Sequence, residues 1–96
     1  MRVWTGWIRV GDRDAYQRYL QETGLRAYRD TEGNLGAFAS YAELGDECEV
    51  RTVSFWRSLD DIRGFAGDDI SRAVFYPEDD RFLVRRRDDV EHFVVG

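Results

Sequence analysis

The stretch "VSFWRSLDDIRGFAG", residues 53–67, predicts the end of a strand followed by a short helix. Its first residues are β-branched and aromatic up to Trp56, which is typical of a strand. Ser58 and Asp61 then stand in a Ser-x-x-Asp arrangement that resembles a capping box, so a helix is predicted to begin there. Gly67 is well placed to end this helix. The apolar residues in between fall on one helical face, as helical spacing requires: Leu59, Ile62, Phe65 and Ala66.

The residues before this stretch predict a strand followed by a helix. "RVWTGWIRV" (2–10) has apolar residues on both faces, which predicts a strand covered on both sides. One face carries Val3, Thr5 and Trp7, and the other carries Trp4, Ile8 and Val10. "GDRD" (11–14) then supplies a helix cap. The helical spacing of apolar residues continues to Ala27, although Gly24 interrupts it, and the missing side chain there is expected to permit close packing on the sheet.

The rest of the chain predicts a hairpin, a short helix and two final strands. "LGAFASYAEL" (35–44) and "CEVRTVSFW" (48–56) form the hairpin around the turn "GDE". "DDISRAVFY" (68–76) predicts a short helical piece that ends before Pro77. "DRFLVRRR" (80–87) and "VEHFVV" (90–95) predict the two strands, and the carboxylates of "YPEDD" between helix and strand are expected to be exposed turn residues.

This order of elements is the ferredoxin-like split β-α-β pattern, an α+β fold with an antiparallel sheet. The 96 residues form one domain, residues 1–96, because chains divide only at greater length. Hydrophobic residues make up 43% of the chain and aromatic residues 15%, which is more apolar surface than one small core can bury. The composition therefore predicts a homodimer.

Charge and residue usage exclude several function classes. A net charge of −5 argues against nucleic-acid binding. The absence of lysine excludes a Schiff-base lysine mechanism. A single cysteine and a single histidine give no zinc ligand set, and the lone Cys48 suits a reducing compartment. No run approaches the ~20 apolar residues of a membrane span, so a cytoplasmic protein without membrane partners is expected.

Three segments together resemble one family over nearly the whole chain. They are "FWRSLDDIRGFAG" after the third strand, "RAVFYPEDDRFLV", and the C-terminal "VEHFVV". Together they resemble the antibiotic-biosynthesis-monooxygenase-like family of dimeric α+β barrels. The resemblance implies that two sheets from two subunits pack face to face and that the C-terminal strand reaches across the partner. Such proteins include cofactor-free oxygenases of aromatic polyketides, quinol oxygenases and haem-degrading enzymes.

The resemblance implies a role for few individual residues. Trp56 matches the tryptophan that lines the pocket in the polyketide oxygenases and the haem-degrading members. Thr52 and Ile62 stand where the polyketide oxygenases carry an asparagine and a tyrosine. Near Phe65 and Ala66, where the haem-degrading members place an iron-ligating histidine, this chain has none.

The candidate catalytic residues are His92 and Tyr76. His92 is the only histidine, and its ordinary pKa near neutrality suits a general base that removes a phenolic proton. It could equally be a hydrogen-bonded residue on an exposed terminal strand. Tyr76 could serve in the same way, or be a buried tyrosine with a purely structural partner.

The candidate substrate-binding residues are Trp56, Phe65, Tyr41 and Arg51. Trp56 is either a pocket wall that stacks on a planar substrate or a core aromatic that seals sheet against helix. Arg51 lies in the middle of a strand, so it either pairs with an acid such as Glu49 or binds an anionic substrate.

The leading functional expectation is a monooxygenase-type oxidoreductase that acts on a planar aromatic or quinol-like molecule without metal or other cofactor. One alternative is a hydrophobic small-molecule binder or cyclase-like protein without redox chemistry. A haem protein is the third possibility, and a dimer whose pocket is filled by its own aromatic residues is the fourth.

Overall fold

A computed structural model describes residues 1–96 and contains one five-stranded antiparallel sheet. The strands are β1 (Arg2–Arg9), β2 (Asn34–Leu44), β3 (Glu47–Trp56), β4 (Leu83–Arg86) and β5 (Glu91–His92). The helices are the 3-10 turn η1 (Val10–Asp12), α1 (Arg13–Glu22), α2 (Gly24–Asp30), α3 (Leu59–Ala66) and α4 (Asp79–Phe82). The α+β class predicted from the sequence is confirmed.

Strand β1 is the centre of the sheet, whose order is β2-β3-β1-β4. The predicted hairpin is present as β2 and β3, and β3 pairs with the whole length of β1. Strand β4 pairs with the second half of β1, and β5 pairs with Arg2 and Val3 at its start. The two predicted C-terminal strands therefore share one edge of β1.

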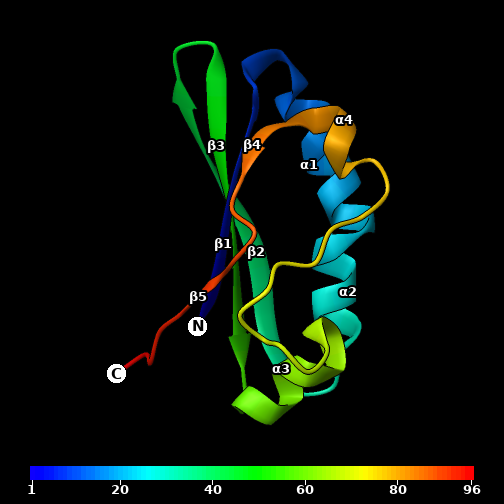
Figure 1. The fold of residues 1–96 in the computed structure, drawn as a ribbon, viewed down its shortest axis with the longest axis vertical. Coiled ribbons are helices and arrows are strands. Elements are labelled where there is room, and N and C mark those ends of the chain that lie inside the picture. The colour runs from blue at the N-terminus through cyan, green and yellow to red at the C-terminus, as the bar shows by residue number, and fades with distance from the viewer.

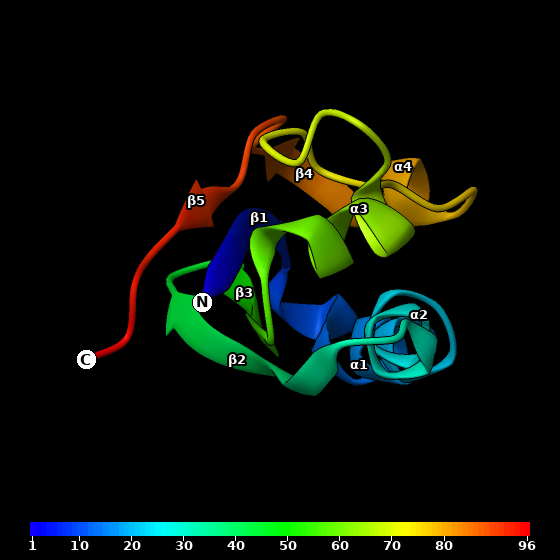
Figure 2. The same cartoon turned by 90° about the horizontal axis from the view of Figure 1, so that it is seen from below.

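The helices all lie on one face of this sheet (Figures 1 and 2). Helices α1 and α2 run along the face one after the other, α3 covers one end, and residues 67–78 cross between α3 and α4 (Figure 1). Strand β1 alternates as predicted, with Trp4 and Ile8 buried beneath the helices and Val3 and Trp7 half-buried on the other face. Val10, predicted to continue the strand, lies in η1 instead.

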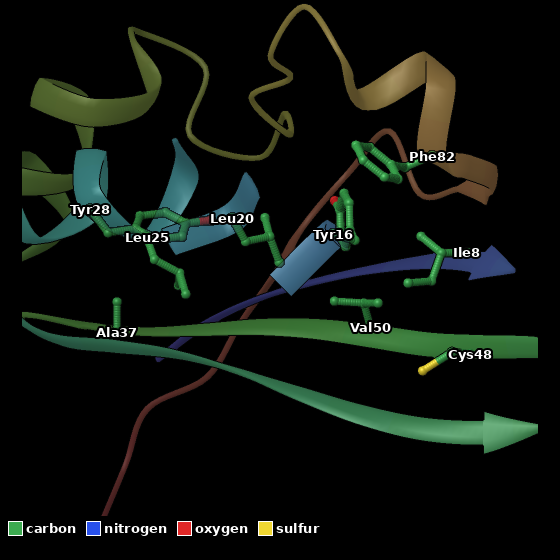
Figure 3. Packing of buried hydrophobic residues seen from close by; sticks show 9 residues of the cluster. All are labelled: Ile8, Tyr16, Leu20, Leu25, Tyr28, Ala37, Cys48, Val50 and Phe82. Carbon is green, nitrogen blue, oxygen red and sulfur yellow. The ribbon is translucent and has the colours of Figure 1, made fainter. Parts of the chain in front are cut away.

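The core lies between the helices and the sheet (Figure 3). Tyr16 and Phe82 pack at the end near α4, and Tyr28 packs at the other end near α3 (Figures 1 and 3). The nine buried residues of this cluster are Ile8, Tyr16, Leu20, Leu25, Tyr28, Ala37, Cys48, Val50 and Phe82. Full burial of the larger aliphatic and phenylalanine side chains among them contributes about 1.5–3 kcal/mol each.

The predicted boundaries of α3 are confirmed. The Ser58 hydroxyl accepts a hydrogen bond of 3.2 Å from the Asp61 backbone N–H, which satisfies one free donor at the start of the helix. Gly67 ends the helix with a φ of 83°, a conformation that favours glycine.

The predicted break at Gly24 is also present, but not for the predicted reason. Helix α1 ends at Glu22 and α2 begins at Gly24, with the Thr23 hydroxyl donating to the Tyr19 carbonyl at 2.8 Å. A side chain at position 24 would meet Tyr76 and Leu20 at ordinary contact distances, and no strand. Close packing on the sheet therefore does not require this glycine.

Residues 68–76 do not form the predicted helix. The Asp69 carboxylate accepts hydrogen bonds from both the backbone N–H and the hydroxyl of Ser71, a local turn that competes with helix formation. Ala73 N–H then donates to the Asp88 carbonyl at 2.8 Å, which holds the segment extended beside the end of the chain. The helix forms later, as α4, and takes the first residues of the predicted strand 80–87.

The face of the sheet opposite the helices is uncovered (Figure 2). It carries the half-buried apolar residues Val3, Trp7, Val53 and Phe55 together with Phe38, which is 49% exposed. The predicted strand 90–95 pairs with β1 over Glu91–His92, and Phe93 exchanges two hydrogen bonds with Met1 before the chain leaves the sheet. Phe93, Val94 and Val95 at this end are exposed.

Candidate functional site

A small cavity lies between the inner face of the sheet, the junction of α1 and α2, helix α3 and the segment 67–78. We call it the inner cavity. It is lined by Arg2, Trp4, Tyr16, Leu20, Gly24, Tyr28, Thr52, Phe65, Val74, Phe75, Tyr76 and Asp79. The free space in it is about 20 Å³, which is room for about one water molecule. A larger ligand therefore requires the wall to move.

Arg2 brings a positive charge into this cavity. Its side chain is 1% exposed because β1 alternates and position 2 shares the covered face with Trp4. One terminal nitrogen donates to the Tyr28 hydroxyl at 3.1 Å, and the other donates to the Arg72 carbonyl at 2.9 Å. Nε has no partner. Burial lowers the pKa of Arg2, although a guanidinium stays protonated at neutral pH.

Asp79 brings a carboxyl group into the same cavity. It is 4% exposed, which corrects the expectation that the carboxylates of "YPEDD" are all exposed. It accepts a hydrogen bond of 2.6 Å from the Tyr76 backbone N–H, and the Tyr16 hydroxyl donates to it at 3.5 Å. Burial raises the pKa of Asp79 above its usual range, and burial also raises the pKa of Tyr16.

The remaining cavity wall is aromatic and hydroxylic. The Tyr28 hydroxyl lies 3.3 Å from that of Thr52, and the ring of Tyr28 packs on Phe65 with 4.3 Å between centroids. The ring of Trp4 meets Phe75 edge to face at 6.1 Å. Tyr76 also lines the cavity, and burial raises the pKa of its hydroxyl. These planar walls suit a planar ligand.

Two of the six predicted site residues, Phe65 and Tyr76, line the inner cavity. Trp56 lies directly behind this wall: its ring packs against Tyr28 and Phe65, each with centroids 6.2 Å apart. The Trp56 indole N–H donates to the Ser54 hydroxyl at 2.8 Å. Trp56 is therefore a support of the cavity wall rather than part of its surface.

Trp56 and His92 both line a different space, an open groove of about 530 Å³, which we call the outer groove. It is lined by Met1, Leu35, Phe55, Trp56, Arg57, Ser58, Leu59, Ile62, His92, Phe93, Val94 and Val95. His92 is exposed, and its Nε2 lies 3.0 Å from the Ile70 carbonyl oxygen.

Tyr41 and Arg51 line neither space. Tyr41 packs against the core near the Arg13 guanidinium, which lies 5.4 Å from its ring, and its buried hydroxyl has no partner. Arg51 is exposed and forms an ion pair of 3.0 Å with Glu49, so the predicted pairing is confirmed.

The sequence reasoning did not identify Arg2 or Asp79. For Arg2 a signal was present, because the alternation that places Trp4 on the covered face places position 2 there as well. For Asp79 there was none, because its burial depends on the contact between α4 and α1.

No group of three or more histidine, cysteine, aspartate or glutamate side chains could hold a metal ion. No helix has both the length and the apolar character needed to cross a bilayer. Comparison of the chain with known family models and with curated proteins gives no match.

Proposed function

We propose that this protein binds a small planar aromatic or quinol-like molecule in the inner cavity and oxygenates it without a metal or organic cofactor. The observation that carries the proposal is the buried carboxyl of Asp79 at the wall of an aromatic cavity. Groups with perturbed pKa values in such cavities are candidates for acid–base work.

The fold supports this assignment. The order β2-β3-β1-β4, with helices on one face, is the order expected of a ferredoxin-like domain. The uncovered apolar face, with Phe38 and Phe55 6.3 Å apart, suits a second copy of the chain and so supports a homodimeric barrel.

In the proposed reaction Asp79 accepts the proton of a substrate phenol. Burial raises the pKa of this carboxyl, which brings it closer to that of a phenol and makes the transfer less unfavourable. The phenolate is electron-rich and reduces dioxygen directly. A ring carbon–oxygen bond forms, and loss of water from the hydroperoxide leaves a quinone. One oxygen atom thus enters the product and the other leaves as water.

Substrate entry requires the segment 67–78 to move, because the cavity holds about one water molecule. This segment contributes Val74, Phe75 and Tyr76 to the wall. It is held by few backbone hydrogen bonds, among them Val90 N–H to the Ser71 carbonyl at 2.8 Å. Closure over a substrate would exclude water from the reactive phenolate.

A binding protein without redox chemistry is the second candidate. It is favoured by the hydrogen bonds that Asp79 already accepts from Tyr76 and Tyr16, which tie the carboxyl to the fold. Both candidates predict the same ligand and differ in oxygen uptake.

The test is a thermal-shift screen with quinols and phenols, followed by oxygen-electrode measurements with any ligand that stabilises the fold. We expect Asp79→Asn to retain ligand binding and to lose at least about 100-fold in oxygen uptake, the range of general-base catalysis. Asp80→Asn is the matched control, because Asp80 is exposed and pairs with Arg86. Equal uptake by both variants would remove Asp79 from the mechanism. Binding without uptake by the wild type would establish the second candidate.

A further inference from the structure

We propose that Arg2 is the anion-binding residue of the inner cavity, so that the ligand is a planar aromatic molecule with a negatively charged oxygen, such as an aromatic carboxylate. This inference rests on the proposed function for the location of the ligand. It adds the charge of the ligand and the residue that selects it.

Arg2 is a buried charge without a counter-ion. It is the only one of the 14 arginines that is buried. Ten ion pairs occur in the structure, and none includes Arg2. Buried charges are ordinarily paired, because removal from water is costly. An anionic ligand would supply the counter-ion that Arg2 lacks within the chain.

The guanidinium also has a free donor. Its terminal nitrogens bond to the Tyr28 hydroxyl and the Arg72 carbonyl, whereas Nε–H has no acceptor. A guanidinium presents its N–H groups in a planar fork that matches the two oxygens of a carboxylate. An anionic oxygen at the cavity wall would satisfy this donor.

One of the two hydroxyl groups next to the Arg2 guanidinium is a second free donor. The Tyr28 oxygen accepts from Arg2 and lies 3.3 Å from the Thr52 oxygen. Only one of these two hydroxyls can donate to the other, so the second hydroxyl proton has no acceptor in the chain. An anion at this position would accept from both the guanidinium and a hydroxyl.

Two aromatic rings lie close to the Arg2 guanidinium, but neither carries a negative charge that could pair with it. The guanidinium carbon lies 5.4 Å from the centre of the Phe65 ring and 5.9 Å from that of Tyr28. Asp79 forms no ion pair with Arg2, and it accepts its hydrogen bonds from the Tyr76 backbone N–H and the Tyr16 hydroxyl. Because the two charged groups do not pair with each other, each can contact a different oxygen of one ligand.

The experiment compares two probes of the same shape and different charge, 4-hydroxybenzoate and the neutral 4-hydroxybenzamide. Binding is measured by calorimetry at neutral pH. We expect the wild type to bind the acid at least about tenfold more tightly than the amide, as a charge-assisted hydrogen bond provides. We expect Arg2→Met to lose this preference and Arg2→Lys to keep part of it. The matched control is Arg18→Met, which removes an exposed arginine without an ion pair and should keep the preference in full.

Equal binding of acid and amide by the wild type would overturn the inference, and this comparison needs no variant to fold. A preference for the acid over the amide that persists in Arg2→Met would also overturn it. If the wild type bound only the amide, and oxygen uptake occurred with neutral phenols, the anion site would be wrong while the proposed function stood. Absence of binding by either probe would overturn the inference together with the cavity as their binding site.

Discussion

The substitution Gly6→Ala tests how tightly Trp4 is held at the wall of the inner cavity. Gly6 lies in the centre of β1, on the covered face, where the indole of Trp4 lies over it. A Cβ at position 6 would lie 2.7 Å from Cζ2 of Trp4, and closer still to the neighbouring ring carbon. It would also lie 3.0 Å from Cδ2 of Leu83. The indole must therefore move.

Trp4 cannot move without loss of its contacts. Its indole N–H donates to the Arg87 carbonyl at 2.8 Å, and its ring packs against Phe75. Overpacking costs about 1–3 kcal/mol, and loss of the hydrogen bond adds about 1 kcal/mol. We expect Gly6→Ala to lower the free energy of unfolding by about 2–4 kcal/mol.

The assay is urea unfolding followed by tryptophan fluorescence. With a slope of about 1–3 kcal/mol per molar urea, the midpoint should fall by roughly 0.7–4 M. Gly11→Ala is the control, because a Cβ there meets no atom within 4 Å. In a Trp4→Phe background the cost of Gly6→Ala should fall by about 1 kcal/mol or more. A loss below about 0.5 kcal/mol in the wild-type background, or an equal loss in both backgrounds, would refute this reasoning.

Three further predictions concern the helix cap, the buried carboxyl and the uncovered face. Ser58→Ala should cost about 1 kcal/mol in urea unfolding, because it removes the acceptor at the start of α3; an unchanged midpoint would contradict the cap. Burial raises the pKa of Asp79 above its unfolded value, so its contribution to stability falls as pH rises from about 4 through the folded pKa. Asp79→Asn should remove this pH dependence of the free energy of unfolding. If the wild type and Asp79→Asn showed identical profiles of stability against pH, Asp79 would not be its source. Val53→Asp on the uncovered face should convert a dimer to a monomer in analytical ultracentrifugation, and a monomeric wild type would remove the dimer from the account.

Much of the fold could be predicted because its signals are local. The cap at Ser58 and the glycine at 67 determine the ends of α3, and the alternation in residues 2–9 determines which face of β1 is covered. The segment 68–76 could not be predicted in this way. Its conformation depends on pairing with Asp88 and Val90, which are distant in the sequence, and long-range pairing overrides local helical spacing.

The candidate site was harder to predict because its polar residues are of types that usually face water. Arg2 and Asp79 are charged, and general rules place such residues at the surface. Both are buried by tertiary contacts, Arg2 under Tyr28 and Asp79 beside Tyr16. The predicted site residues His92 and Trp56 line the outer groove. Their predicted roles stay predictions.

If the ligand occupies the inner cavity, the three tryptophans should respond to it differently, because they lie in different places. Trp4 lines the cavity, Trp56 stands behind its wall, and Trp7 lies on the uncovered face beneath Arg85. The most direct measurement is an NMR titration of the three indole N–H resonances with 4-hydroxybenzoate and with a quinol. We predict that the Trp4 resonance shifts most and that of Trp7 stays in place. A shift confined to Trp7, or no shift of Trp4 at saturation, would contradict the account.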